Sequence, residues 1–345
     1  MKLRLLVPGN VRHGSGGNRY NASLAAHLIA LGARVETVAV DGDWPVGSTE
    51  DRRRLAEALD GGTPVIADGL VASGAPAEVA SAVMGGTDVW ILSHMALADH
   101  HALEAQSLAA ATGIICPSAY SAGELRAKHG ALEVVVATPG TAAAGVSPGS
   151  EPKHIVAVAA LLPNKSQTEL VEALSQLQDL EWTASLIGSH HADPAYAAKV
   201  RGVVEHYGLQ QRVTLTGELT GKALEEEWHK ADLSVLLSKS ESFGMVVTES
   251  LAHGVPVLVR QGTGAVEALG ASGAGAALDL TREGALAGSL RRWVTDSALQ
   301  ERWRSNALQA RRNLHSWDAT AGTVLDALTS PRAGTTVSGG KRRNP

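Results

Sequence analysis

Two acidic residues flank a glycine-containing segment in the second half of the chain, Glu241 and Glu249 in the run ESFGMVVTE. The pattern predicts a helix that starts at the glycine, with the first carboxylate before the helix and the second two turns inside it. The backbone N–H groups from Gly244 to Val246 would have no acceptor within that helix, so its start would form an anion site. A buried Glu249 would need hydroxyl donors from a ligand or from the protein. Alternatively, Glu241 only caps the helix and Glu249 lies on the surface.

A lysine ends the run LLPNK, residues 161–165, which follows a predicted strand and precedes leucines at helical spacing. Side chains at a strand-to-helix turn on the carboxyl edge of a parallel sheet face the crevice where such sheets bind ligands. Lys165 would neutralise a diphosphate there. The alternative is a solvated surface lysine.

A glycine pair, Gly16 and Gly17, lies between the first predicted strand and a predicted helix at Asn21–Leu31. Such a turn lets backbone N–H groups approach a phosphate, with the positive end of the helix dipole behind them. The spacing does not complete the G-x-G-x-x-G fingerprint of dinucleotide-binding enzymes. Turn glycines with a purely structural role are the alternative.

Short β-branched runs alternate with helical patterns along the chain, which predicts an α/β protein with parallel sheets wrapped by helices. The alternation restarts after a Gly, Ser and Pro cluster at Gly145–Pro152, which we interpret as a linker. We therefore expect domains at 1–148 and 149–312, a final helix at 313–330 and a disordered tail at 331–345. The predicted strands are Leu3–Val7, Arg34–Val40, Pro64–Ala67, Asp88–Ser93, Gly113–Cys116, Glu133–Ala137, His154–Ala159, Thr183–Ile187, Val213–Thr216, Leu233–Leu237, Pro256–Val259 and Ala276–Leu278.

Composition excludes several classes of function. The net charge of -5 over 345 residues disfavours nucleic-acid binding, and 3% aromatic residues disfavour a base-stacking surface. The lone Cys116 excludes an intramolecular disulfide and, with no signal-peptide pattern, favours a cytoplasmic location. No apolar stretch is long enough to form a transmembrane segment. The run Arg52–Arg54 allows peripheral contact with acidic lipids, or is a plain solvated helix face.

Together these motifs resemble those of the retaining glycosyltransferases of family 4. The resemblance covers nearly the whole chain and includes the glycine pair, the LLPNK turn, the 241–249 block, the strand at 213–217 and Ser-Trp-Asp at 316–318. It implies a GT-B fold, in which two Rossmann-like domains face each other and a C-terminal helix crosses back to the first. It also implies metal-independent, cofactor-free transfer of a sugar from a UDP- or GDP-sugar, bound by the second domain, to an unidentified hydroxyl acceptor on the side of the first.

The resemblance implies roles for single residues. Lys165 would bind the donor diphosphate, Glu241 the transferred sugar, and Glu249 the ribose hydroxyls. His94 falls where the family often has a histidine near the donor sugar, although a purely structural strand-end histidine is the alternative. The implied catalytic residues are thus Lys165, Glu241 and His94. The implied donor-binding residues are Gly16, Gly17, Lys165, Leu219, Glu241, Phe243, Gly244, Met245, Val246 and Glu249.

Acceptor contacts are assigned to Asn18, Arg19 and Tyr20, after the glycine pair, although surface packing would explain them equally well. Two positions depart from the family pattern. Ala160 stands where an arginine usually precedes the lysine, and Ala142 stands where an aspartate usually follows a Pro-Gly-Thr turn. These departures motivate one alternative, a non-catalytic nucleotide-sugar-binding protein. The other alternative is a GT-B nucleotide-sugar epimerase.

Overall fold

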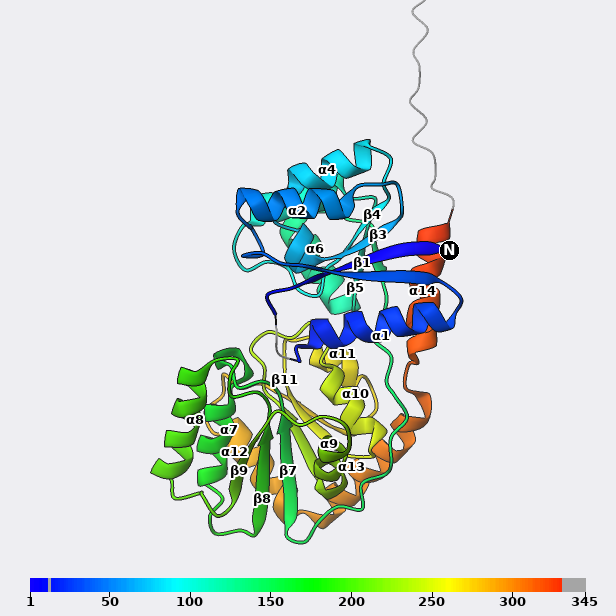
Figure 1. Ribbon diagram of the computed structural model, residues 1–345. Helices are drawn as coiled ribbons and strands as arrows, with labels where there is room; N and C mark the ends of the chain where they lie inside the picture. Colours follow the sequence, from blue (N-terminus) through cyan, green and yellow to red (C-terminus); the bar gives the residue numbers. More distant parts are fainter. Residues whose placement is uncertain (12–13, 331–345) are drawn as a thin grey trace, which may run out of the picture.

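The first half of the chain folds around a six-stranded parallel sheet with strand order β2-β1-β3-β4-β5-β6 (Figure 1). The computed structural model describes residues 1–11 and 14–330. The strands of this sheet are β1 (Lys2–Pro8), β2 (Arg34–Val40), β3 (Val65–Asp68), β4 (Val89–Leu92), β5 (Gly113–Cys116) and β6 (Val134–Val136). The helices between them are α1 (Gly16–Ala30), α2 (Thr49–Leu59), α3 (Gly69–Ala72), α4 (Pro76–Met84), α5 (His101–Ala110) and α6 (Ala119–His129).

The second half repeats this architecture around another six-stranded parallel sheet, with strand order β12-β11-β10-β7-β8-β9. Its strands are β7 (Lys153–Val158), β8 (Trp182–Ile187), β9 (Val213–Gly217), β10 (Leu233–Leu236), β11 (Val257–Arg260) and β12 (Gly275–Leu278). Its helices are α7 (Gln167–Ser175), α8 (Pro194–His206), α9 (Gly221–Lys230), α10 (Met245–Ala252), α11 (Ala265–Leu269), α12 (Ala285–Thr295) and α13 (Ser297–Ala310), with 3₁₀ turns η1 (Pro163–Lys165) and η2 (Arg311–Asn313). All the predicted strands are therefore confirmed, with shifts of one residue at some ends.

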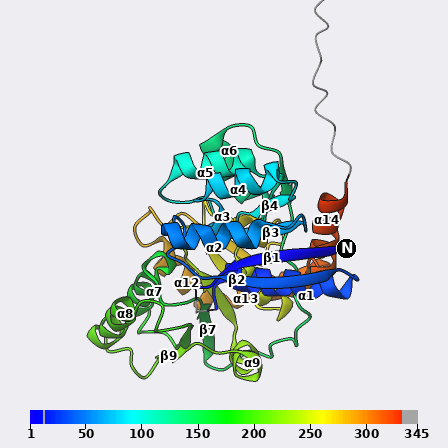
Figure 2. The ribbon, with the colours of Figure 1, turned by 45° about the horizontal axis from the view of Figure 1, so that its top comes forward.

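The central strands of each sheet are buried on both faces, which is why they are apolar at successive positions, whereas the edge strand β2 is largely exposed. In β3, Val65 and Ala67 pack into a core formed with α2, α4, α5 and α6, whereas Ile66 points to the opposite face and packs with α1 and α14. The helices accordingly lie on both sides of the first sheet (Figure 2). This arrangement leaves the strand ends, and the turns that follow them, as the surfaces that can hold a ligand.

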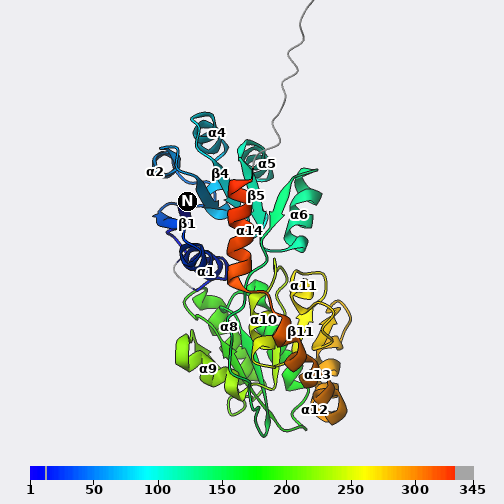
Figure 3. The ribbon, with the colours of Figure 1, turned by 90° about the vertical axis from the view of Figure 1, so that its right-hand side faces the viewer.

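The last helix, α14 (Trp317–Thr329), crosses back to the first domain and lies beside α1 (Figure 3). Ser316 caps its start by accepting a hydrogen bond from the N–H of Ala319. Trp317 and Val324 pack into the core of the first sheet, and the hydroxyl of Thr320 donates to the carbonyl of Thr138 at 2.6 Å. The expected GT-B arrangement, including its crossing helix, is confirmed. The tail predicted at 331–345 lies outside the described residues.

Two local predictions are wrong. Helix α1 begins at Gly16 and not at Asn21, because the Ser15 hydroxyl accepts from the N–H of Asn18 and caps an earlier start. The glycine pair therefore forms the first residues of a helix whose own N–H groups have no acceptor within it. Glu249 is the fifth residue of α10, so it lies just over one turn inside that helix and not two.

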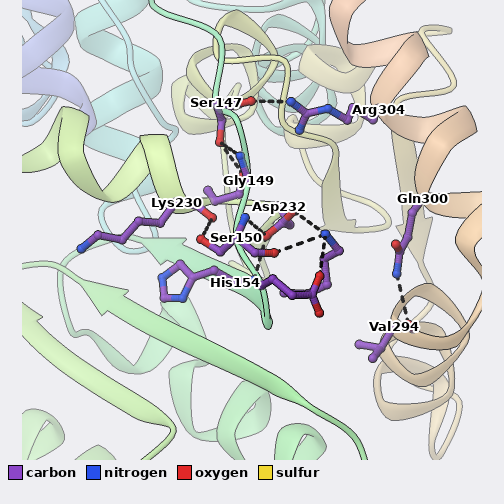
Figure 4. A network of polar contacts seen from close by, with 12 residues as sticks. Ser147, Gly149, Ser150, His154, Lys230, Asp232, Val294, Gln300 and Arg304 are labelled. Carbon is purple, nitrogen blue, oxygen red and sulfur yellow. Dashed lines mark hydrogen bonds and ion pairs between the residues drawn. The ribbon is translucent and has the colours of Figure 1, made fainter.

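The segment predicted as a linker, Gly145–Pro152, is tied to the second domain by a polar network (Figure 4). The Ser147 hydroxyl bonds to the carbonyls of His229 and Ala231, and the N–H of Ser150 donates to Asp232 Oδ2 at 2.9 Å. Residues 147–150 are therefore attached to the second domain by these hydrogen bonds. The boundaries at 148 and 312 stay predictions. Among the described residues, no helix is both long and apolar enough to cross a membrane.

Candidate functional site

A cavity of about 530 Å³ lies between the two domains at the carboxyl edges of their sheets. Most of the predicted site residues line it: Gly16, Gly17, Arg19, Tyr20, His94, Lys165, Leu219, Glu241, Phe243, Gly244, Met245 and Val246. Glu249 lines an adjoining cavity of about 180 Å³, which shares Arg19, Leu224 and Met245 with the first. Asn18 lines neither cavity. The structure thus brings together motifs from both halves of the chain.

Lys165 and Glu241 form an ion pair inside the larger cavity, with 2.8 Å between Nζ and Oε2. The lysine belongs to η1, directly after β7, and the glutamate lies in the loop between β10 and α10. Their side chains are 21% and 17% exposed, so both remain accessible to a ligand. The carbonyl of Glu241 accepts from the N–H of Gly264 at 2.7 Å, which fixes the loop in place. An anion entering here would meet a cation whose position is already set.

The start of α10 supplies further positive charge beside this pair. Gly244 occupies the N-cap position in a left-handed conformation with φ of 85°, and none of the described side chains caps the helix. Its first N–H groups have no acceptor within the helix, and the residues that carry them line the cavity. The loop between β11 and α11 packs against this one and needs a glycine at position 264, because a Cβ there would lie 2.1 Å from the carbonyl oxygen of Ser242.

Glu249 forms an ion pair with Arg19 of the opposite domain, with 2.7 Å between Glu249 Oε1 and Arg19 Nη2. Its Oε2 is buried and has no hydrogen-bond partner among the residues that the structure describes. Burial raises the pKa of this carboxyl, and the Arg19 guanidinium only partly opposes that effect. A hydroxyl donor at Oε2 would relieve the cost of the buried charge.

His94 lies at the first-domain side of the cavity and is held by a buried polar pair that the motifs did not indicate. Its Nε2 donates to Asn21 Oδ1 at 3.0 Å and lies 3.4 Å from Asp68 Oδ2, while Asn21 Nδ2 donates to the same oxygen at 2.6 Å. Burial raises the pKa of Asp68, but the electrostatic contribution of the neighbouring His94 and the hydrogen bonds outweigh it and lower the pKa overall. The signal in the sequence is an aspartate that ends the fully buried strand β3.

The glycine pair packs against this histidine. A Cβ on Gly17 would lie 3.1 Å from Cδ2 of His94, whereas a Cβ on Gly16 would lie 3.9 Å from Cε of Met245. The first-domain side of the cavity therefore presents backbone N–H groups at the start of α1, with an oriented imidazole next to them.

The residues predicted to contact an acceptor have structural partners. Asn18 Nδ2 donates to the carbonyl of Val11 at 2.9 Å, and the buried Tyr20 donates its hydroxyl to the carbonyl of Ala137 at 2.7 Å. Burial raises the pKa of Tyr20. Arg19 pairs with Glu249, as described above. Their contact with an acceptor stays a prediction.

The two departures lie at the cleft: Ala160 lines the larger cavity and Ala142 the smaller one. Leu219 lines the larger cavity and packs against the apolar cluster that includes Trp228. Within residues 1–11 and 14–330, no group of three or more His, Cys, Asp or Glu side chains is arranged to hold a metal ion.

Residues 144–310 match the family model described as Glycosyl transferases group 1. These residues therefore form a Glycosyl transferases group 1 domain. Curated relatives include a D-inositol 3-phosphate glycosyltransferase of Jonesia denitrificans, 28% identical over 57% of this chain and 47% of its own length. Another is a mannosylfructose-phosphate synthase of Agrobacterium fabrum, 31% identical over 32% of this chain and 26% of its own. The chain thus matches about half the length, or less, of these relatives.

Solved structures extend the likeness from the group 1 domain to the whole fold. A sucrose-phosphate synthase from Thermosynechococcus elongatus superposes with a TM-score of 0.79, at 20% identity, over 95% of this chain and 98% of its own. The Anabaena HepE protein in complex with UDP and glucose gives a TM-score of 0.78, at 18% identity, over 96% of this chain and 100% of its own. At such identities the likeness shows the fold alone.

Proposed function

We propose that this protein is a glycosyltransferase that moves a sugar from a nucleotide-diphosphate sugar to a hydroxyl acceptor. One observation carries the proposal: Lys165 and the uncapped start of α10 flank one cavity, and Glu241 and Glu249 lie on either side of that helix start. The arrangement suits a diphosphate with a sugar at each end. The group 1 family match and the names of the relatives support the same activity.

We assign each part of the donor a position in the site from the chemistry of the residues that line it. The diphosphate would lie between Lys165 and the N–H groups from Gly244 to Val246, because both supply positive charge without a metal. Glu241 would accept hydrogen bonds from the transferred sugar, and Glu249 from the ribose. The N–H groups at Gly16 and Gly17 would approach the second phosphate from the opposite domain.

The reaction we propose retains the configuration at the anomeric carbon. The bond between that carbon and the β-phosphate oxygen breaks, the acceptor oxygen bonds to the carbon on the same face, and the acceptor proton passes to the leaving phosphate. Lys165 and the start of α10 would stabilise the charge that develops on the leaving group. His94, oriented by Asn21 and Asp68, would contact the transferred sugar. No protein nucleophile is required.

The donor base is most directly addressed by a binding screen. UDP-, GDP- and ADP-sugars would each be added to the protein, and unfolding would be followed by thermal shift. We expect a UDP- or GDP-sugar to stabilise it by about 2.7 kcal/mol at a hundred times its dissociation constant. The variant Lys165→Ala should lose this shift, whereas Lys239→Ala, an exposed lysine paired with Glu169, should keep it.

Product analysis then separates the alternatives. A glycosyltransferase releases the nucleoside diphosphate in proportion to the glycoside formed. An epimer formed from donor alone would indicate an isomerase, and donor binding without any product under acceptor screening would indicate a sensor. Failure of all three donor classes to bind would contradict the proposal. We expect the reaction to occur in the cytoplasm, as the single cysteine suggests.

A further inference from the structure

A carboxylate of the second domain caps a helix of the first. The N–H groups of Ala119 and Tyr120, the first two residues of α6, donate to the two oxygens of Glu267 at 2.9 and 2.7 Å. The next N–H, of Ser121, donates to the Ser118 hydroxyl at 2.9 Å. Figure 3 shows α6 directly above α11, which carries Glu267. A negative charge at this end of a helix is favourable, so the contact attracts one domain to the other.

Two further hydrogen bonds join the same surfaces. The Tyr120 hydroxyl donates to the carbonyl of Gly262 at 2.9 Å, and the Ser118 hydroxyl donates to the carbonyl of Ser242. Ser242 follows Glu241, whose side chain pairs with Lys165. The contact between the domains therefore includes the loop that carries Glu241, the residue proposed to bind the transferred sugar.

Glu267 is also linked to that loop from within its own domain. Its N–H donates to the carbonyl of Gly264 at 3.0 Å, and the N–H of Gly264 donates to the carbonyl of Glu241 at 2.7 Å. Gly264 also packs closely against this loop, since a Cβ at that position would lie 2.1 Å from the carbonyl oxygen of Ser242. A displacement of Glu267 would thus be transmitted to Glu241 through two backbone hydrogen bonds.

We propose that Glu267 is a positioning residue for sugar transfer: by capping α6 it holds the two domains closed and keeps the Glu241 loop in its reactive position. The inference rests on the proposed function for its catalytic consequence, but not for its effect on domain closure. The contact is not needed to fold either domain. Helix α6 packs into the first core through Ala122 and Leu125, and α11 packs into a second-domain core through Ala265 and Leu269.

The variant Glu267→Ala tests closure directly, through a distance between labels on the two domains. Cysteines introduced as Met84→Cys and Lys222→Cys suit the purpose, since Met84 is 83% exposed and the Lys222 side chain 91% exposed. The native Cys116 should not compete for the label, because it is buried and its pKa is raised to about 12. We expect the distance distribution to broaden towards longer values in Glu267→Ala, while the melting temperature falls only slightly, because the cap is lost but each domain keeps its own core.

Steady-state transfer gives the second readout. We expect kcat/KM of Glu267→Ala to fall about tenfold, the usual size of a coupling between sites. In Glu267→Gln, which keeps one acceptor oxygen, kcat/KM should fall less than in Glu267→Ala. The same is expected of Tyr120→Phe. The matched control is Glu301→Ala, an exposed glutamate of α13, which should leave both readouts at the wild-type value.

The outcomes separate this inference from the proposed function. An unchanged distance distribution in Glu267→Ala overturns the inference, whatever the activity. A broader distribution with unchanged kcat/KM overturns the link to the Glu241 loop. If the wild type binds no nucleotide sugar, the proposed function fails, but the distance measurement needs no substrate and still decides whether Glu267 closes the cleft.

Discussion

The two sides of the cleft are built on similar sheets, yet they present different chemistry. The second-domain side offers charged side chains at strand-to-helix turns, with Lys165 paired to Glu241 and Glu249 paired across the cleft to Arg19. The first-domain side offers backbone N–H groups at the start of α1, a histidine held by a buried pair, and Arg19 as the partner of Glu249. The second-domain side would therefore recognise a charged ligand mainly through side chains. The first-domain side would do so mainly through backbone N–H groups and an oriented histidine.

This difference suggests that the two sides of the cleft have different roles in binding and transfer. Side-chain charges in partly exposed ion pairs can exchange a protein partner for a ligand, so the second-domain side suits binding and release of a charged donor. The buried Asp68, 4% exposed, cannot exchange its partners in this way. It suits the fixed placement of a single group. Substitutions on the second-domain side should therefore change donor affinity and transfer most, and those on the first-domain side should have smaller effects.

The largest effect is expected for Lys165→Ala. Loss of the ammonium group removes a charge that stabilises the leaving phosphate, so transfer should fall by about 10² to 10³. The fold should remain, because Glu241 is 17% exposed and water can solvate it. Steady-state kinetics and a melting curve measure the two quantities. Lys239→Ala serves as the control, and equal activity in both variants would contradict the assigned role.

Glu249→Gln should separate binding from stability. Hydrogen bonds from ribose to a charged acceptor would be weakened, so donor affinity should fall about ten- to a hundredfold by calorimetry. Because burial raises the pKa of Glu249, its ionised form costs stability. The wild type should therefore lose stability as pH rises from the unfolded pKa through the folded pKa, and Gln at this position should lack that slope. A variant less stable than wild type at pH 8 would refute this account.

Asp68→Asn tests the first-domain side. Removing the charge that His94 and Asn21 contact should cost about 1 to 3 kcal/mol of unfolding free energy at neutral pH and lower kcat about tenfold. The pKa of Asp68 is lowered, so its contribution is present above the unfolded value, about 3.9, and is lost as pH falls through the folded value. Urea unfolding at pH 7 and pH 3 measures this. An equal difference between the proteins at both pH values would show that the charge is not responsible.

The glycine pair allows the smallest and most local comparison. Gly17→Ala would bring a methyl group to 3.1 Å from the His94 ring and displace it, whereas Gly16→Ala meets Met245 at an ordinary 3.9 Å. We expect transfer to fall severalfold in Gly17→Ala and less in Gly16→Ala. Kinetics of the two variants, with the NMR shifts of the His94 ring, distinguish them. A larger loss in Gly16→Ala would mean that His94 placement is not what the pair protects.

The sequence predicted the two sheets because buried parallel strands read as apolar runs between helical patterns. It also predicted the second-domain side, since Lys165 and the 241–249 block occupy turns where their residue types are informative. The start of α1 was predicted too late. Ser15 caps this helix by accepting a hydrogen bond from the N–H of Asn18, and the spacing of apolar residues does not indicate such a cap. The role of Asp68 depends on neighbours 26 and 47 residues away, which no local pattern connects.

The contacts between residues of the two domains were also not predicted from the sequence. Arg19 and Glu249 come from different domains, as do Tyr120 and Glu267, and their contacts depend on how the two domains face each other. Sequence periodicity fixes which residues share a face of one helix, but it holds no information on the docking of two separate sheets. These contacts could be found only once both domains were placed.

A crystal structure with a bound nucleotide-diphosphate sugar is the most direct test of the central claim. Our account predicts diphosphate oxygens about 3 Å from Lys165 Nζ and from the N–H groups at the start of α10, with the ribose on Glu249. A donor bound outside the two adjoining cavities, or with its diphosphate away from Lys165, would contradict it.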